Sequence, residues 1–186
     1  SEDPCYTISG VITRTERTTT QAGYAPDKSV PVRFAHVTLW EEDPISDDWE
    51  GEGITDANGR YSFDFCDDDG FGGGGLELYL NLVVSMYDPA QPEWDDFEVV
   101  FVEDSSWIDE RYDYDSSVIT PPEGGSFEIN MALNLEQSAA FNIADAIFDA
   151  WRTWQLNGGA SGGDEAVDIT AEVHWEIDYE EVDPFD

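Results

Sequence analysis

The chain has 186 residues, of which 43 are acidic and seven are basic, so its formal net charge is −36. Nucleic acids and anionic membranes are bound by clustered Lys and Arg, and the composition therefore excludes both as expected partners. Hydrophobic residues make up 40% of the chain, which is enough for a packed core, so we expect one folded domain or one domain with an appendage. The sequence has no run of about 18 apolar residues, so no membrane span is expected.

The first third of the sequence predicts three strands separated by polar segments. A strand over residues 6–14 is followed by a stretch rich in Thr, Gly and Pro, 15–31, which we expect to form a loop or a hairpin. Residues 32–41 predict the second strand. The acidic segment 42–53 is rich in turn formers, and residues 54–66 predict a third strand that a turn interrupts.

The turn and the strands around it carry the clearest local signal in the chain. The apolar residues of 37–40 and 61–65 recur at every second position, which is typical of strands with one packed face and one solvated face. Between the strands, the carboxylate of Asp56 can close an Asx-turn, and Asn58 and Gly59 both tolerate positive φ. This region predicts a half-buried sheet and contains no catalytic group.

Further strands are expected in the middle of the chain. A glycine-rich connection at 67–75 precedes a strand over 76–87, in which every second residue is apolar. Residues 97–103 predict a short strand that is apolar on both faces. Residues 113–120 and 126–135 flank a Pro-Pro-Glu-Gly-Gly segment, which indicates a hairpin.

The last quarter of the chain changes period and predicts one helix followed by one strand. Apolar residues recur at helical spacing over 139–156. Ser138 is expected to cap the start of this helix, and Asn157-Gly158 is expected to end it. After a glycine-rich loop, residues 167–177 alternate as in a strand.

Two segments carry a family resemblance. They are Pro31-Val-Arg-Phe-Ala-His-Val-Thr-Leu-Trp-Glu-Glu-Asp and Gly53-Ile-Thr-Asp-Ala-Asn-Gly-Arg-Tyr-Ser-Phe. They resemble the transthyretin-like proteins and the carboxypeptidase regulatory-like domains, which show a "V-x-L-W-x-x-D" strand, an acidic loop and then "T-D-x-x-G-x-Y/F-x-F". Ile8-Ser-Gly-Val-Ile12 is similar to the first strand of those families. The resemblance covers about residues 6–87 and implies a transthyretin-like (prealbumin-like) β-sandwich, a fold that serves many functions.

The fold class expected from these patterns is mainly β: an antiparallel β-sandwich with one C-terminal helix and a final strand. Residues 1–135 would form the sandwich, and residues 136–186 would add the helix and strand as an extension packed on it. An alternative is that the chain is the non-catalytic N-terminal region of a larger secreted protease, because such proteases can carry similar sandwiches beside their catalytic domain.

The two cysteines, Cys5 and Cys66, lie just before the first predicted strand and just after the third. If these strands run side by side, the two thiols can form a disulfide; two free thiols are the alternative. Closing a loop of this length would stabilise the fold by about 4 kcal/mol. A disulfide implies a secreted, cell-surface or periplasmic setting.

The sequence does not indicate an enzyme. His36 and His174 are the only histidines, and both are expected on solvated strand faces. The chain contains no H-E-x-x-H helix and no G-x-S-x-G elbow. Transthyretin relatives that hydrolyse 5-hydroxyisourate use a C-terminal Tyr-Arg-Gly-Ser tail, which the final residues here do not match. Paired carboxylates of the glycosidase type are uninformative in so acidic a chain.

Calcium is the cofactor that the acidic loops could hold, because Ca²⁺ takes six to eight oxygen ligands. The candidate ligands come from two loops: Asp67, Asp68 and Asp69 from one, and Asp43, Asp47 and Asp48 from the other. Solvated loops are the alternative interpretation. The acidity also suits a salty medium, where screening removes self-repulsion, or a cationic partner.

Four tryptophans fall at strand ends or in expected loops and could form a ligand platform: Trp40, Trp49, Trp94 and Trp107. Exposed aromatic rings beside carboxylates can stack on sugars or hold a cation, although each ring could instead pack over a sheet edge. We therefore expect a non-enzymatic, extracytoplasmic recognition or accessory module that binds a protein or a surface glycan. A carbohydrate-binding sandwich is one form of this expectation.

Overall fold

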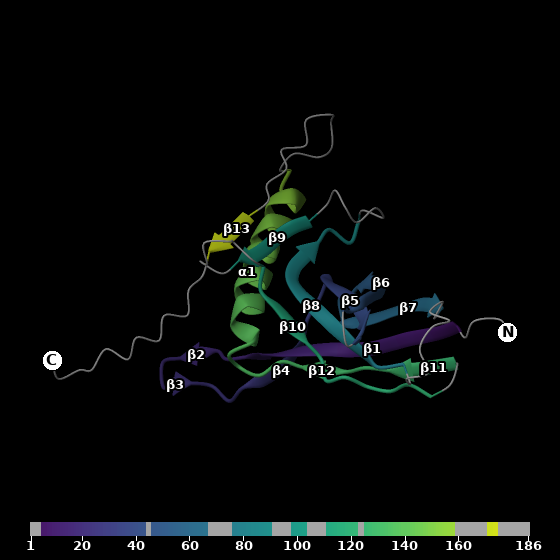
Figure 1. The fold of residues 1–186 in the computed structure, drawn as a ribbon. Coiled ribbons are helices and arrows are strands. Elements are labelled where there is room, and N and C mark those ends of the chain that lie inside the picture. Colours follow the sequence, from purple (N-terminus) through teal and green to yellow (C-terminus); the bar gives the residue numbers. More distant parts are fainter. Residues whose placement is uncertain are drawn as a thin grey trace.

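The computed structural model shows a mainly β protein, with one helix among the residues that it describes (Figure 1). It describes residues 5–43, 46–66, 76–90, 98–103, 111–122 and 125–158, together with the backbone of 171–174.

A five-stranded sheet is organised around one long strand, β1 (Cys5–Glu16). The first half of β1 lies between β7 (Arg60–Cys66) and β11 (Gly125–Glu128). Its second half lies between β4 (Lys28–Pro31) and β12 (Met131–Ala132). β4 and β7 run antiparallel to β1, whereas β11 and β12 run parallel to it.

A six-stranded sheet contains the remaining long strands. Its path is β13 (Ala171–His174), β9 (Glu98–Glu103), β8 (Leu78–Tyr87), β5 (Ala35–Glu41) and β6 (Asp48–Ile54), and β10 (Asp113–Asp115) also pairs with β8. All pairs are antiparallel except that of β13 with β9. A separate two-stranded hairpin, β2 (Thr19–Thr20) with β3 (Gly23–Tyr24), projects beyond β1 and β4 (Figure 1) and confirms the hairpin alternative for residues 15–31.

Both sheets and the helix α1 (Ser138–Leu156) contribute to a single hydrophobic core. The alternation predicted for β8 is confirmed, because its even-numbered residues from Leu78 to Met86 are at most 1% exposed. Val37 and Leu39 of β5 are fully buried as predicted. The helix adds four buried residues to this core: Ala140, Phe141, Ala144 and Phe148. The helix therefore packs on the sheets, and the division of the chain at residue 135 remains a prediction.

The prediction of a turn-rich segment over 42–53 is wrong for its second half, because β6 pairs with β5 there. The sequence of β6 lacks the alternation of apolar residues that is typical of a strand, because its two buried residues are glycines. Gly51 and Gly53 lie against the ring of Phe63, and a Cβ atom at Gly53 would come within 2.9 Å of that ring. The glycines thus provide room for an aromatic side chain from β7.

The expected hairpin of 113–120 with 126–135 is also wrong. β10 pairs with β8, while β11 and β12 pair with β1. Parallel pairing brings the backbones close at Gly10, where a Cβ atom would lie 1.9 Å from the carbonyl oxygen of Ile129. Parallel partners that are distant in the chain leave no local sequence signal.

The helix spans the predicted range and ends at Asn157 and Gly158 as expected, with Gly158 at a φ of 88°. Ser138 is not its N-cap, because the capping position is Gln137, whose side chain makes no capping hydrogen bond. The buried Ser138 hydroxyl instead accepts a hydrogen bond from the backbone N–H of Thr15 at 2.8 Å and donates to the carbonyl of Asn134. This contact fixes the start of the helix on β1.

Charged side chains fasten the helix to the sheets. Arg14 is 7% exposed and donates to Asp145 at 2.6 Å and to Asn142 at 2.8 Å. Arg33 donates to the other oxygen of Asp145 at 2.5 Å and to Asp149 at 2.6 Å. Because two guanidinium groups share one partly buried carboxylate, the pairs fix the helix in one orientation on the sheets.

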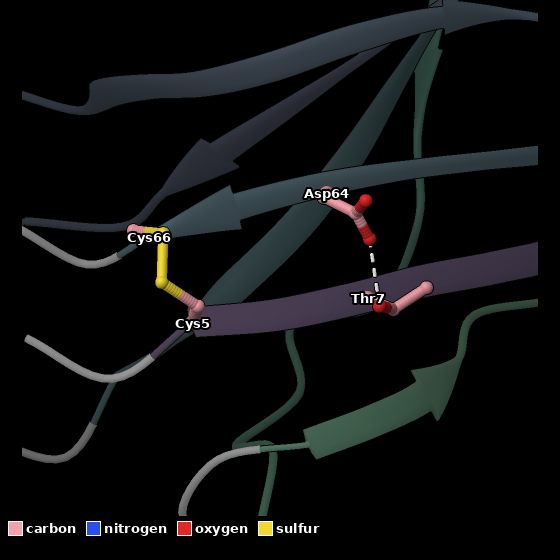
Figure 2. Close-up of a disulfide and its surroundings, with 4 residues drawn as sticks. All are labelled: Cys5, Thr7, Asp64 and Cys66. Carbon is pink, nitrogen blue, oxygen red and sulfur yellow. Dashed lines mark hydrogen bonds between the residues drawn. A yellow bond between two sulfur atoms is a disulfide. The ribbon is translucent and has the colours of Figure 1, made fainter.

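The predicted disulfide is present between Cys5 and Cys66, which are directly opposite each other in the β1–β7 ladder. Figure 2 shows this bond beside the hydrogen bond from Thr7 to Asp64, which crosses the same two strands at 2.6 Å. The predicted turn is confirmed as well: the Asp56 carboxylate accepts the N–H groups of Asn58 and Arg60. Within the described part of the chain, no helix is long and apolar enough to cross a membrane.

Candidate functional site

The candidate site lies on the face of the six-stranded sheet that points away from the core. Trp40 of β5 is directly opposite Trp49 of β6 on one side and Tyr79 of β8 on the other. Trp49 is 54% exposed. Opposite residues in an antiparallel pair point to the same face, so the three rings form a row across three strands.

A second row beside these rings is polar. Thr38 is opposite Asn81, and Asn81 is opposite Asp115 of β10. The indole N–H of Trp40 donates to the Thr38 hydroxyl at 2.8 Å, which fixes the ring over the polar row.

The two rows border a groove with a volume of about 310 Å³. Its lining consists of two rings, three carboxylates and one amide, from Trp40, Asp47, Tyr79, Asn81, Asp113 and Asp115. We call it the acidic aromatic groove. It brings together strands β5, β8 and β10 and the residue that precedes β6.

Hydrogen bonds inside the groove hold its polar groups in place. The Asn81 amide nitrogen donates to Asp113 at 2.5 Å and to Asp115 at 2.9 Å. The Tyr79 hydroxyl donates to Asp47 at 2.8 Å. Burial, followed by the hydrogen bond to Asp47, raises the pKa of Tyr79 above its usual range, so this phenol remains a donor at any physiological pH.

The groove is unbalanced in charge. Among the residues that the structure describes, its lining includes three aspartates but no Lys, Arg or His. Glu42 lies close enough to act on Tyr79 and adds to the negative potential. A groove that concentrates one sign of charge attracts ligands of the opposite sign, so its chemistry suits a cation.

A second cluster of polar side chains lies near the other end of β8. His36 contacts Glu52 at 2.8 Å, and its ring packs edge-on against Tyr87. Glu98 accepts a hydrogen bond from Arg111 at 2.8 Å, but its Oε1 atom is buried without a hydrogen-bond partner among the described residues. Burial raises the pKa of Glu98, and the neighbouring Arg111 guanidinium opposes this shift.

The raised pKa of Glu98 predicts a specific pH dependence. The native state keeps the Glu98 proton at pH values where the unfolded chain has lost it, so this group's contribution to stability falls as pH rises above about 4.5. Glu98→Gln removes the titration. We therefore expect the stability of the variant relative to the wild type to increase between pH 4.5 and 7.5, as measured by urea unfolding. A constant or decreasing difference would contradict the assignment.

The structure places several residues of the site expected from sequence at or beside this groove. Trp40 and Asp47 line the groove, and Trp49 lies beside Trp40. The backbone N–H of Asp43 donates to the Asp47 carboxylate at 3.2 Å, whereas Asp48 is exposed on β6. Among the residues that the structure describes, no three His, Cys, Asp or Glu side chains are grouped closely enough to hold a metal.

The remaining expected site residues lie outside the described residues: Asp67, Asp68, Asp69, Trp94 and Trp107. A calcium site in the acidic loops therefore stays a prediction. The side chain of His174 also lies outside the described part.

Sequence reasoning missed four groove residues: Tyr79, Asn81, Asp113 and Asp115. Tyr79 and Asn81 belong to β8, and the buried face of this strand was predicted from the sequence. The same alternation therefore indicates that Tyr79 and Asn81 lie on the opposite, outer face. The two aspartates could not be placed, because their position depends on the pairing of β10 with β8 across about thirty residues of sequence.

No protein-family model matches the chain, and no curated protein is similar to it in sequence. Solved structures with some likeness include a 9R-lipoxygenase from Cyanothece PCC8801, at 17% identity and a TM-score of 0.33 over 71% of this chain and 16% of that one. Another is an (S)-allantoin synthase, at 12% identity and a TM-score of 0.34 over 72% of this chain and 42% of that one. The chain thus spans less than half of either structure, and likenesses this low do not define a function.

Proposed function

We propose that this chain is a non-enzymatic, extracytoplasmic recognition or accessory module built on a transthyretin-like β-sandwich. Its acidic aromatic groove would bind a cationic group of a partner. The observation that carries this proposal is the lining of the groove, in which three carboxylates and two aromatic rings converge and to which the described part of the chain contributes no basic side chain.

The fold part of the proposal is supported by the two sheets that share one core and by the positions of the family-like segments. These segments coincide with β1, β5 and β7. The extracytoplasmic part is supported by the Cys5–Cys66 disulfide, because such bonds persist in oxidising compartments. The acidic surface would remain soluble in saline surroundings.

Aromatic rings beside carboxylates favour organic cations. A cation near the face of Trp or Tyr is attracted by the ring, by about 0.5–2 kcal/mol depending on solvent exposure. Carboxylates add charge-assisted hydrogen bonds of about 1.5–3 kcal/mol each. A short basic peptide therefore meets both kinds of contact in the acidic aromatic groove.

The test compares binding of a lysine-rich peptide to the wild type and to Asp113→Asn/Asp115→Asn by titration calorimetry in about 0.3 M salt, where long-range attraction is screened. Loss of two charge-assisted contacts is expected to weaken binding about 10-fold or more. The control is Glu16→Gln/Asp64→Asn, which removes the same two charges from the five-stranded sheet. Equal weakening in both variants, or in neither, would refute the groove as the binding site.

A glycan is the second candidate ligand, because the row that contains Trp40 and Trp49 resembles a stacking platform for sugar rings. This alternative predicts binding of a neutral oligosaccharide that depends on Trp49 and does not depend on Asp113 or Asp115. Trp49→Ala, tested beside Asp113→Asn/Asp115→Asn with both ligands, therefore separates the candidates.

A further inference from the structure

We infer that the ligand of the acidic aromatic groove is a cation that carries N–H donors, namely the primary ammonium of a lysine or the guanidinium of an arginine in a basic peptide. This inference rests on the proposed function and makes it more specific. It follows from which hydrogen-bonding positions of the groove are occupied and which remain open.

Every side-chain donor that the described residues contribute to the lining is already used within this site. The Trp40 indole N–H is bonded to Thr38, and the Tyr79 hydroxyl is bonded to Asp47. Both amide hydrogens of Asn81 are committed, one to each neighbouring aspartate. Carboxylates only accept hydrogen bonds, so the amide nitrogen of Asn81 must be the atom that faces them.

The positions that remain open are all acceptors. Asp113 and Asp115 each use one oxygen for Asn81, which leaves the second oxygen of each carboxylate without a partner in the described part of the chain. The side-chain oxygen of Asn81 adds a third acceptor. The two aspartates are alternate residues of one strand, so their side chains point to the same face about 6–7 Å apart.

A groove with open acceptors and no open side-chain donors selects for ligands that only donate. Ammonium and guanidinium groups have this property, with three and five N–H donors and no acceptor. A sugar hydroxyl both donates and accepts, so part of its capacity would remain unsatisfied. A quaternary ammonium has no N–H group and would leave the carboxylate oxygens desolvated without hydrogen bonds.

The size of the groove also fits one basic side chain. A volume of about 310 Å³ is at the lower end of the range for ligand sites. Trp40 and Tyr79 lie at one end, where they can cover the aliphatic stem of such a side chain, and the two aspartates of β10 lie beside Asn81. A second copy of this chain is an unsuitable partner, because both copies would carry a charge of −36.

The experiment uses three peptides of equal length and charge, built from lysine, arginine or trimethyl-lysine, and measures their affinity for the wild type by calorimetry. We expect the lysine and arginine peptides to bind about 10-fold tighter than the trimethyl-lysine peptide. In Asp113→Asn/Asp115→Asn this preference should disappear, while Glu16→Gln/Asp64→Asn should retain it. Free spermidine, tested alongside, distinguishes a peptide ligand from a small polyamine: tighter binding of spermidine would overturn the peptide assignment.

The outcomes separate this inference from the proposed function. If trimethyl-lysine binds as tightly as lysine and both depend on Asp113 and Asp115, the groove binds cations but the requirement for N–H donors is wrong. If no peptide distinguishes the groove variant from its charge-matched control, the proposed function itself fails. If a neutral oligosaccharide binds where the peptides do not, the glycan alternative replaces both.

Discussion

Replacement of both cysteines, Cys5→Ser/Cys66→Ser, is expected to lower the free energy of unfolding by about 4 kcal/mol. The disulfide closes a loop of 61 residues, and opening it restores conformational entropy to the unfolded chain. Folded domains of this size are stable by only about 5–15 kcal/mol, so the loss would be a large fraction of the total. The free energies of unfolding of the variant and the wild type are measured by urea unfolding at equal ionic strength.

The matched control for the disulfide is the wild type unfolded in the presence of a strong reductant. Reduction should destabilise the wild type by a similar amount and should leave the double serine variant unchanged. The adjacent Thr7–Asp64 hydrogen bond holds the same two strands together, so we expect β1 and β7 to remain paired in both cases. A loss below about 1 kcal/mol would show that the disulfide does not constrain the unfolded chain as supposed.

Phe148→Ala is expected to cost about 3–5 kcal/mol, comparable to the loss of the disulfide. Phe148 is fully buried on α1 and packs against Phe34 at 5.4 Å between ring centroids and against Trp151 at the same distance. The guanidinium of Arg33 also lies over its ring at 5.9 Å. Truncation would leave a cavity between the helix and the sheets, which neither can close without moving.

The control is Leu156→Ala on the same helix, where the side chain is 80% exposed and truncation should change stability by less than about 0.5 kcal/mol. Thermal and urea unfolding of both variants give the comparison. If Phe148→Ala and Leu156→Ala have equal effects, the helix contributes little to the core. The segment after residue 135 would then be better described as a separate appendage.

Local patterns predicted much of the fold. Alternation identified the buried faces of β5 and β8, and helical spacing identified α1 to within one residue of its start. The turn at Asp56 followed from side-chain chemistry alone. In each case the signal lies within about twenty residues, so no knowledge of the tertiary structure was needed.

The predictions were wrong where the structure depends on tertiary packing and the local sequence pattern is absent or misleading. β6 was missed because its buried positions are Gly51 and Gly53, which adapt to Phe63 and give no apolar alternation. The parallel pairing of β11 and β12 with β1 was missed because the partners are more than 100 residues apart. Ser138 looked like a cap, but its hydroxyl is used between the helix and β1.

In the candidate site too, some residues can be predicted from local sequence and others depend on tertiary pairing. Of the two aromatic residues of the groove, Trp40 was predicted from the sequence, whereas Tyr79 was not. The selectivity that we propose for the groove depends on Asp113 and Asp115, which reach it only through the pairing of β10 with β8. Because 43 residues of the chain are acidic, composition alone does not distinguish the three that converge on the groove.

The most direct test of the account is an NMR titration of the folded protein with a lysine-rich peptide in about 0.3 M salt. The account predicts that the largest chemical-shift changes occur at the indole N–H of Trp40 and the side-chain amide of Asn81. These changes should saturate together, and in Asp113→Asn/Asp115→Asn they should require about 10-fold more peptide or more. Shifts that spread over the acidic surface without saturation, or that centre on another part of the molecule, would contradict a cation site in this groove.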